Sequence, residues 1–195
     1  MGDHQHGLPQ LVDLHGAGLR QAVREAVEPL YDALLQAGVQ VLLDDLQLAR
    51  AVAAAAARLD TRFELWIEID VDGHRAGLEP DEPELPEIGR FVRDSERLEL
   101  RGVLTHAGGA YDCRSADALR VHAEQERDRC VRAAQALRAA GVPCPGVSVG
   151  STPTALSAQS LEGVTELRAG VYVFQDLFQA GLGVCRVDDI ALSVL

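Results

Sequence analysis

FELWIEIDVDGHRAG, at residues 63–77, joins a short apolar segment to a polar loop that contains glycine. The apolar part predicts a buried strand over residues 63–69 that ends at Asp70. The loop that we predict over residues 71–83 is rich in Gly, Asp and Pro, which are typical turn residues. A buried strand followed by a polar loop is typical of the central sheet of an α/β protein.

The same alternation continues on both sides of this stretch. Other apolar runs predict strands at residues 39–43, 98–104 and 147–149, in the region of Leu167, Val171 and Val173, and at residues 190–195. Helices are predicted between them, after a cap at Asp45, from about Pro86 to Glu96, and from a cap at Ser115 to Ala140. Strands that alternate with helices predict βαβ units and a parallel sheet.

A parallel sheet of this kind either stays open or closes into a barrel. Polar segments follow four successive predicted strands, at residues 70–75, 106–111, 150–154 and 170–172. Several strand ends that converge on one site favour a barrel. The six or seven predicted strands are nevertheless too few, since a closed barrel has eight strands and typically needs ~250 residues. We therefore expect an α/β fold, an incomplete TIM-type (β/α) barrel of parallel strands.

The chain divides into two parts. We predict an atypical N-terminal helical segment over residues 1–35 and the partial barrel over residues 36–195.

The composition limits the partners and the location of the chain. The net charge of -12 argues against nucleic acid or an anionic membrane as a partner. No apolar run is long enough to span a membrane, and we find no signal sequence. Four cysteines without a CxxC pair or zinc-like spacing favour reduced thiols, so we expect a cytoplasmic protein.

All 18 residues counted as Lys or Arg are arginine, so the sequence contains no lysine. The base composition of a GC-rich genome would produce this bias on the surface. The bias also has a chemical consequence. Schiff-base chemistry needs a lysine amine, and a guanidinium does not replace it.

Two of the polar segments suggest contacts with an anionic or aromatic ligand. Arg75 is able to hydrogen-bond an anionic oxygen, although a solvated loop with an internal ion pair explains its segment equally well. His106 ends a predicted strand and precedes Gly108 and Gly109, which let the backbone approach a ligand. An imidazole there is able to stack on a ring or exchange a proton, and Tyr111 lies close by in sequence.

The other two segments suggest phosphate contacts. The turn SVGSTPT at residues 148–154 offers backbone N–H groups and hydroxyls as a nest for a phosphate. It is not a Walker loop, since the Gly-Lys-Ser/Thr ending is missing, and a capped turn that opens a helix is the alternative. A second contact through the amides of Gly170 and Val171 is plausible.

Together, four segments resemble those of the fold-type III pyridoxal-phosphate enzymes: in chain order they are EIDVDGHRAG, THAGGAY, SVGSTPT and ELRAGVYVF. The resemblance is to the D-threonine aldolase and D-serine dehydratase family in particular. This family is related to the alanine racemase N-terminal barrel. The resemblance covers about residues 39–195. It implies cofactor-binding roles for Arg75, His106, Tyr111, Thr152, Gly170 and Val171. In these roles, Arg75 would lie near the phenolic oxygen of pyridoxal 5'-phosphate and His106 near the plane of its ring. Tyr111 would reach the phosphate or the substrate, Thr152 would use its hydroxyl, and the last two residues would bind phosphate through backbone amides.

The chain also departs from the family pattern. Nothing in it matches the Schiff-base lysine of the first barrel strand, so the resemblance implies a barrel that lacks its first strand or strands, and no catalytic residue is assigned. The family's metal ligands lie in a C-terminal β domain that we expect to be absent here. The resemblance implies a lyase that cleaves or dehydrates a D-β-hydroxy amino acid, present as a truncated chain, and a homodimer as one oligomeric state. A non-catalytic remnant that binds pyridoxal phosphate or another phosphorylated ligand, and a non-functional gene fragment, are the alternatives.

Overall fold

The computed structural model describes residues 40–192, which belong to one compact unit. The predicted helical segment at residues 1–35, its boundary with the barrel, and residues 193–195 lie outside the described residues. Within the described range, no helix combines the length and apolar character that crossing a bilayer requires. The four cysteines are free thiols, as predicted.

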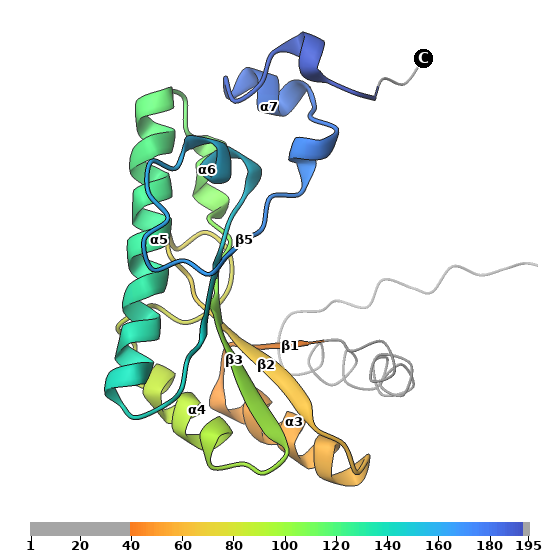
Figure 1. Cartoon of the computed structure of the whole chain (residues 1–195), viewed down its shortest axis with the longest axis vertical. Helices are drawn as coiled ribbons and strands as arrows, with labels where there is room; N and C mark the ends of the chain where they lie inside the picture. The colour runs from red at the N-terminus through yellow and green to blue at the C-terminus, as the bar shows by residue number, and fades with distance from the viewer. Residues whose placement is uncertain (1–39, 193–195) are drawn as a thin grey trace, which may run out of the picture. The chain divides into compact units, whose positions relative to one another are not determined.

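Five strands form one parallel sheet, and their order in space follows their order in the chain (Figure 1). They are β1 (Val41–Leu43), β2 (Phe63–Glu68), β3 (Leu98–Leu104), β4 (Gly146–Val149) and β5 (Glu166–Leu167). The first four confirm the predicted strands. In a doubly wound sheet the strand order reverses at a switch point, whereas in a barrel wall each strand pairs with the next one. The observed order is therefore that of part of a barrel, as predicted.

The predicted strands after residue 160 are largely wrong. Val171 and Val173 lie in the 3-10 helix η3 (Val171–Val173), so that β5 contains two residues only. Ile190 ends the 3-10 helix η4 (Val187–Asp189), and residues 191–192 are not in a strand. A short apolar run becomes a strand only where a neighbour accepts its backbone hydrogen bonds, and β4 pairs with Glu166 and Leu167 alone in this region.

Three long helices connect the strands: α3 (Leu46–Arg58), α4 (Glu84–Arg93) and α5 (Ala116–Ala139). The predicted caps are confirmed, because the Asp45 carboxylate accepts the Leu48 N–H at 2.6 Å and the Ser115 hydroxyl accepts the Ala118 N–H at 3.2 Å. Helix α4 begins two residues before Pro86 and ends before Glu96, which corrects both predicted ends. A proline is tolerated throughout the first helical turn, so it does not mark the first helical residue uniquely.

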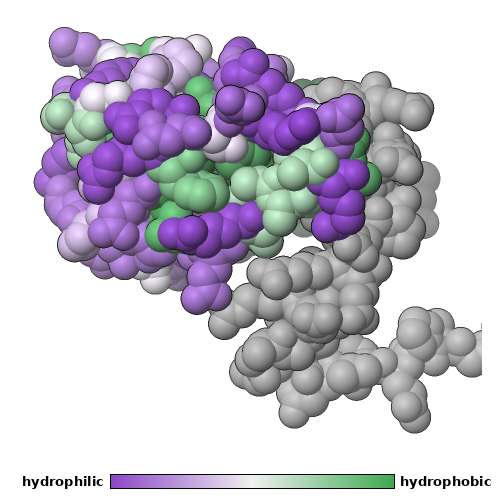
Figure 2. Space-filling model, turned by 90° about the horizontal axis from the view of Figure 1, so that it is seen from below, coloured by the Kyte–Doolittle hydropathy of each residue, from purple (hydrophilic) through white to green (hydrophobic). Residues whose placement is uncertain are grey.

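The core lies between the sheet and these helices, which cover one face of it (Figure 1). Strand β2 alternates accordingly, with Phe63, Leu65 and Ile67 buried and the side chains between them partly exposed. Seen from below, the molecule shows a hydrophobic centre with hydrophilic residues around it (Figure 2). The candidate site, described below, lies at the C-terminal ends of the strands.

A bulge next to Gly102 brings β3 close to β4. The pairing of β2 with β3 passes from Leu100 to Gly102 and skips Arg101. Gly102 has a φ of +155°, and a Cβ there would lie 2.1 Å from the Gly146 carbonyl oxygen. Only glycine fits this position, which fixes the register of the two strands that lead into the site.

Replacing Leu65 with alanine tests the core. The side chain is 0% exposed, so we expect Leu65→Ala to lower the free energy of unfolding by about 2–5 kcal/mol in a urea titration. Leu42→Ala on the neighbouring strand, where the side chain is 44% exposed, is the control and should cost roughly 0.5 kcal/mol. Equal losses in the two variants would contradict the placement of the core.

Candidate functional site

The loops that follow β3, β4 and β5 enclose a cavity of about 520 Å³ at the C-terminal ends of the strands. Short helices form part of these connections: the 3-10 helix η2 (Gly108–Asp112) follows β3, and α6 (Thr152–Ser157) follows β4. The residues that line the cavity are His106, Tyr111, Gly150, Ser151, Thr152, Arg168, Ala169, Gly170 and Val171. Because parallel strands end at one edge, segments up to 65 residues apart meet there, between His106 and Val171.

Five of the six predicted cofactor-binding residues line this cavity, and Arg75 does not. Arg75 is exposed in the loop after β2, and the stem of its side chain lies against Gly108. Its positive charge nevertheless acts on the site: burial raises the pKa of Tyr111 and Arg75 opposes that rise, while Arg75 adds to the lowering of the His106 pKa that burial causes. Arg75 is therefore an electrostatic neighbour of the cavity in this structure.

His106 forms an aromatic wall with Tyr111. The two rings are stacked with centroids 6.0 Å apart and planes 19° from parallel, and the Tyr111 ring also contacts Phe178 of α7 (Leu177–Gly181). Burial lowers the pKa of His106, and the charges of Arg75 and Arg168 lower it further, while a hydrogen bond with the Gly150 backbone opposes them. The imidazole is thus neutral at neutral pH and presents a flat, uncharged surface.

The turn at residues 150–154 differs from the predicted phosphate nest. The Gly150 N–H donates to Glu126 Oε1 at 3.1 Å and the Ser151 N–H donates to Thr154 Oγ1 at 3.1 Å, so neither amide is available to a ligand. Ser151 instead caps α6 in a capping box, as the alternative interpretation of this turn proposed. The hydroxyl of Thr152 is different: it is buried and has no hydrogen-bond partner within the described part of the chain.

Gly170 and Val171 lie on the open side of the cavity. Gly170 is exposed, and a Cβ added to it would meet nothing within 4 Å, so protein neighbours do not require glycine there. Val171 begins η3 and does not belong to a strand. Both residues line the cavity, and the contact of their amides with a ligand stays a prediction.

Arg168 is a cavity residue that the sequence reasoning did not select. Its Nε donates to the Ser148 hydroxyl of β4 at 2.7 Å and its Nη2 donates to the carbonyl of Thr105, the residue after β3, so the guanidinium joins the ends of neighbouring strands. It also forms an ion pair with Glu166 at 3.7 Å. Arg168 lies two residues before Gly170, in one of the four polar segments of the sequence, and this position could have identified it as a site residue.

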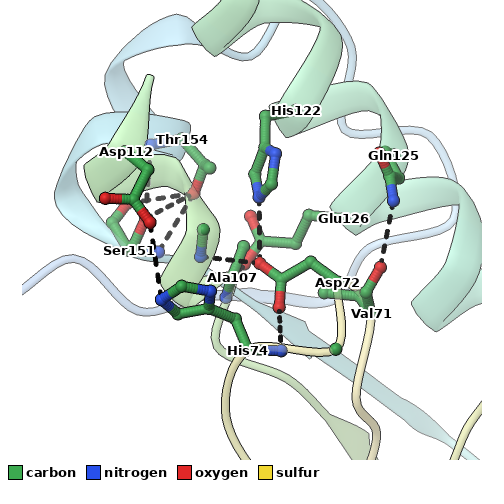
Figure 3. A network of polar contacts seen from close by, with 12 residues as sticks. Val71, Asp72, His74, Ala107, Asp112, His122, Gln125, Glu126, Ser151 and Thr154 are labelled. Atoms are coloured by element: carbon green, nitrogen blue, oxygen red, sulfur yellow. Dashed lines mark hydrogen bonds and ion pairs between the residues drawn. The ribbon is translucent and has the colours of Figure 1, made fainter. Parts of the chain in front are cut away.

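A polar network behind the cavity was also missed (Figure 3). Glu126 of α5 is 2% exposed and binds backbone amides of two loops. One turn earlier, His122 Nε2 lies 3.0 Å from Asp72 Oδ2, and the same oxygen accepts the Gly109 N–H at 2.8 Å. Helix α5 thus holds the loops after β2, β3 and β4 from behind. A sequence pattern does not separate these residues from the solvated polar face of the same helix.

The cavity fits an aromatic phosphate such as pyridoxal 5'-phosphate in three respects. It has a buried hydroxyl without a partner at Thr152, a neutral flat ring at His106, and a cationic group at Arg168. Residues 40–192 contain no cluster of three His, Cys, Asp or Glu side chains of the kind that binds a metal ion.

Comparison with known proteins agrees with this geometry. The family model for the alanine racemase N-terminal domain matches residues 12–177. The D-threo-3-hydroxyaspartate dehydratase of Delftia sp. is 54% identical over 158 residues, which are 80% of this chain and 41% of that protein. The D-serine dehydratase of Dictyostelium discoideum is 26% identical over 168 residues, with coverage of 80% and 42%.

Solved structures show the same relation. The D-threo-3-hydroxyaspartate dehydratase from Delftia sp. superimposes with a TM-score of 0.77 at 49% identity, over 89% of this chain and 44% of that chain. D-Threonine aldolase from Filomicrobium marinum gives a TM-score of 0.66 at 26% identity, over 73% and 38%. The chain therefore spans less than half the length of these relatives.

The environment of His106 predicts how it titrates. Its pKa should lie below the ordinary 6.5, measured from the ring proton shifts in an NMR titration. Between the folded and unfolded pKa values the unfolded chain binds more protons, so the free energy of unfolding should fall as the pH is lowered through this range. In His106→Asn that part of the pH dependence should disappear. A midpoint at or above 6.5 would refute the proposed burial of the ring.

Proposed function

Because the chain belongs to the alanine racemase N-terminal domain family, we propose that it forms the cofactor-binding part of a pyridoxal-phosphate-dependent lyase that acts on D-amino acids with a β-hydroxyl group. The observation that supports this most directly is the cavity at the strand ends, which is lined in part by Thr152, a residue whose buried hydroxyl has no partner among the described residues. The cytoplasmic location and the homodimer stay predictions.

Pyridoxal phosphate, when bound, supplies an electron sink that stabilises negative charge at the substrate carbon. The residues of this chain would hold and orient it. The Thr152 hydroxyl would donate to a phosphate oxygen, and the amides of Gly170 and Val171 would donate from the open side. The neutral ring of His106 would lie against the cofactor ring, and the charge of Arg75 would attract its phenolic oxygen.

The relatives support a lyase acting on a β-hydroxy amino acid, but they do not distinguish elimination of the hydroxyl from cleavage of the carbon chain. Two dehydratases and an aldolase share this part of the chain, and both reactions need a β-hydroxyl on the substrate. Retro-aldol cleavage and β-elimination therefore stand together in this proposal. Residues 40–192 contain no group of three His, Cys, Asp or Glu side chains suited to a metal ion, and no metal ligand is assigned among them.

The absence of lysine supports a second candidate function, a non-catalytic protein that binds the cofactor. The chain has no lysine, so pyridoxal phosphate bound to it forms no Schiff base with a side chain. A non-catalytic protein that holds the cofactor by hydrogen bonds and stacking alone has the same features. DNA that flanks the reading frame separates the two, because a lysine-bearing strand in frame with this chain would support the lyase.

The Thr152 hydroxyl should contribute measurably to cofactor binding. A hydrogen bond to a charged group is worth about 1.5–3 kcal/mol, so we expect Thr152→Val to weaken the binding of pyridoxal phosphate roughly 10- to 100-fold in a fluorescence titration. Thr61→Val, distant from the cavity, is the matched control and should bind like the unchanged chain. Unchanged affinity in Thr152→Val would exclude the assigned contact.

Borohydride reduction tests the absence of a covalent link. After incubation of the chain with pyridoxal phosphate and reduction, mass spectrometry of the digested protein should find no internal peptide that carries the cofactor, because no side-chain amine is present. A labelled internal peptide would contradict this expectation.

A further inference from the structure

Glu126 joins the two loops that form opposite parts of the cavity (Figure 3). It lies in the middle of α5, and its Oε1 accepts the N–H of Ala107, after β3, at 3.2 Å. The same oxygen accepts the N–H of Gly150, after β4, at 3.1 Å. One carboxylate oxygen therefore fixes the distance between two loops that are 43 residues apart in the chain, from Ala107 to Gly150.

Burying a carboxylate at this position costs free energy, because the charged group leaves water. Glu126 is 2% exposed, and burial raises the pKa of its carboxyl despite hydrogen bonds from Thr154 and from the Ala107 and Gly150 amides. The neighbouring buried positions of α5 are apolar, including Leu119, Cys130 and Leu137. An acid among them is explained by the two amides, which would otherwise be buried without an acceptor.

Both amides belong to the backbone of the candidate site itself. Ala107 directly follows His106, and the His106 ring is hydrogen-bonded to the Gly150 backbone. Gly150 in turn lies two residues before Thr152, which lines the cavity and whose buried hydroxyl has no partner among the described residues. A shift of either loop would therefore move His106 or Thr152 relative to the other.

Gly150 has no freedom to compensate for such a shift. Its φ is +134°, and a Cβ at this position would lie 2.5 Å from the Arg168 carbonyl oxygen. The residue is thus enclosed by the backbone of Arg168, which follows β5, and by the carboxylate of Glu126. Its position depends on both contacts.

We propose that Glu126 is a positioning residue of the cofactor site, whose single oxygen sets the separation of His106 and Thr152 by holding Ala107 and Gly150. The proposal rests on the proposed function for the identity of the ligand. It does not need that function for the loop geometry, which exists in the ligand-free chain. Glu126 itself is not among the residues that line the cavity.

Three variants of the full chain separate positioning from mere stability. Glu126→Gln keeps an oxygen that accepts both amides, and it should bind pyridoxal phosphate within about twofold of the unchanged chain. Glu126→Asp keeps the charge but is one methylene shorter, so it should lose at least one amide and weaken binding about tenfold or more. Leu137→Ala, farther along the same helix face, destabilises the core without contacting either loop and should bind normally.

The same variants are compared by NMR without any ligand. We expect the amide signals of His106, Ala107, Gly150 and Thr152 to move in Glu126→Asp and to stay near their original positions in Glu126→Gln and Leu137→Ala. If the unchanged chain does not bind pyridoxal phosphate, the proposed function fails, and these shifts still decide whether Glu126 positions the loops.

Three results would overturn the inference. The first is an Asp variant with unchanged amide signals at the four positions. The second is a Gln variant that loses binding and shifts these signals as strongly as the Asp variant. The third is a Leu137→Ala variant that weakens binding to the same extent as Glu126→Asp, since the effect would then be one of stability alone.

Discussion

All five strands run in the same direction, and this constraint places every loop of the candidate site at one edge of the sheet. Helices must return the chain to the opposite edge after each strand, and α3, α4 and α5 do so on one face. The site is then assembled from segments that are local neighbours only at the strand ends.

The loops are held by three different kinds of contact, each from a different side. Behind them, the buried carboxylate of Glu126 and the Asp72–His122 pair join helix α5 to the backbone. Arg168 joins the ends of neighbouring strands. On the open side, the rings of Tyr111 and Phe178 are in contact. The result is a cavity in which most polar groups already have protein partners, so that an unpaired hydroxyl at Thr152 is informative.

Much of the fold was predictable from local rules. The caps at Asp45 and Ser115 and the first four strands follow from side-chain chemistry within a few residues. The failures share a cause. Val171 and Val173 have the pattern of a strand, but pairing depends on a neighbour that the pattern does not contain. In the same way, the phosphate nest at Gly150 was predicted from free amides, and the amides are taken by partners distant in sequence.

The sequence allowed most residues that line the cavity to be predicted, but it did not allow their hydrogen bonds and burial to be predicted. Five of the six selected residues line one cavity, because each lies in a segment that follows a strand. Glu126 was not recognisable, since an acid within an amphipathic helix is usually solvated and only the tertiary structure shows that it is buried. The central claim is that this cavity binds pyridoxal phosphate. Amide NMR spectra of the isotope-labelled chain, recorded while the cofactor is added, test it most directly. The account predicts saturable shifts centred on His106, Thr152, Gly170 and Val171, whereas no shifts, or shifts confined to other parts of the chain, would contradict it.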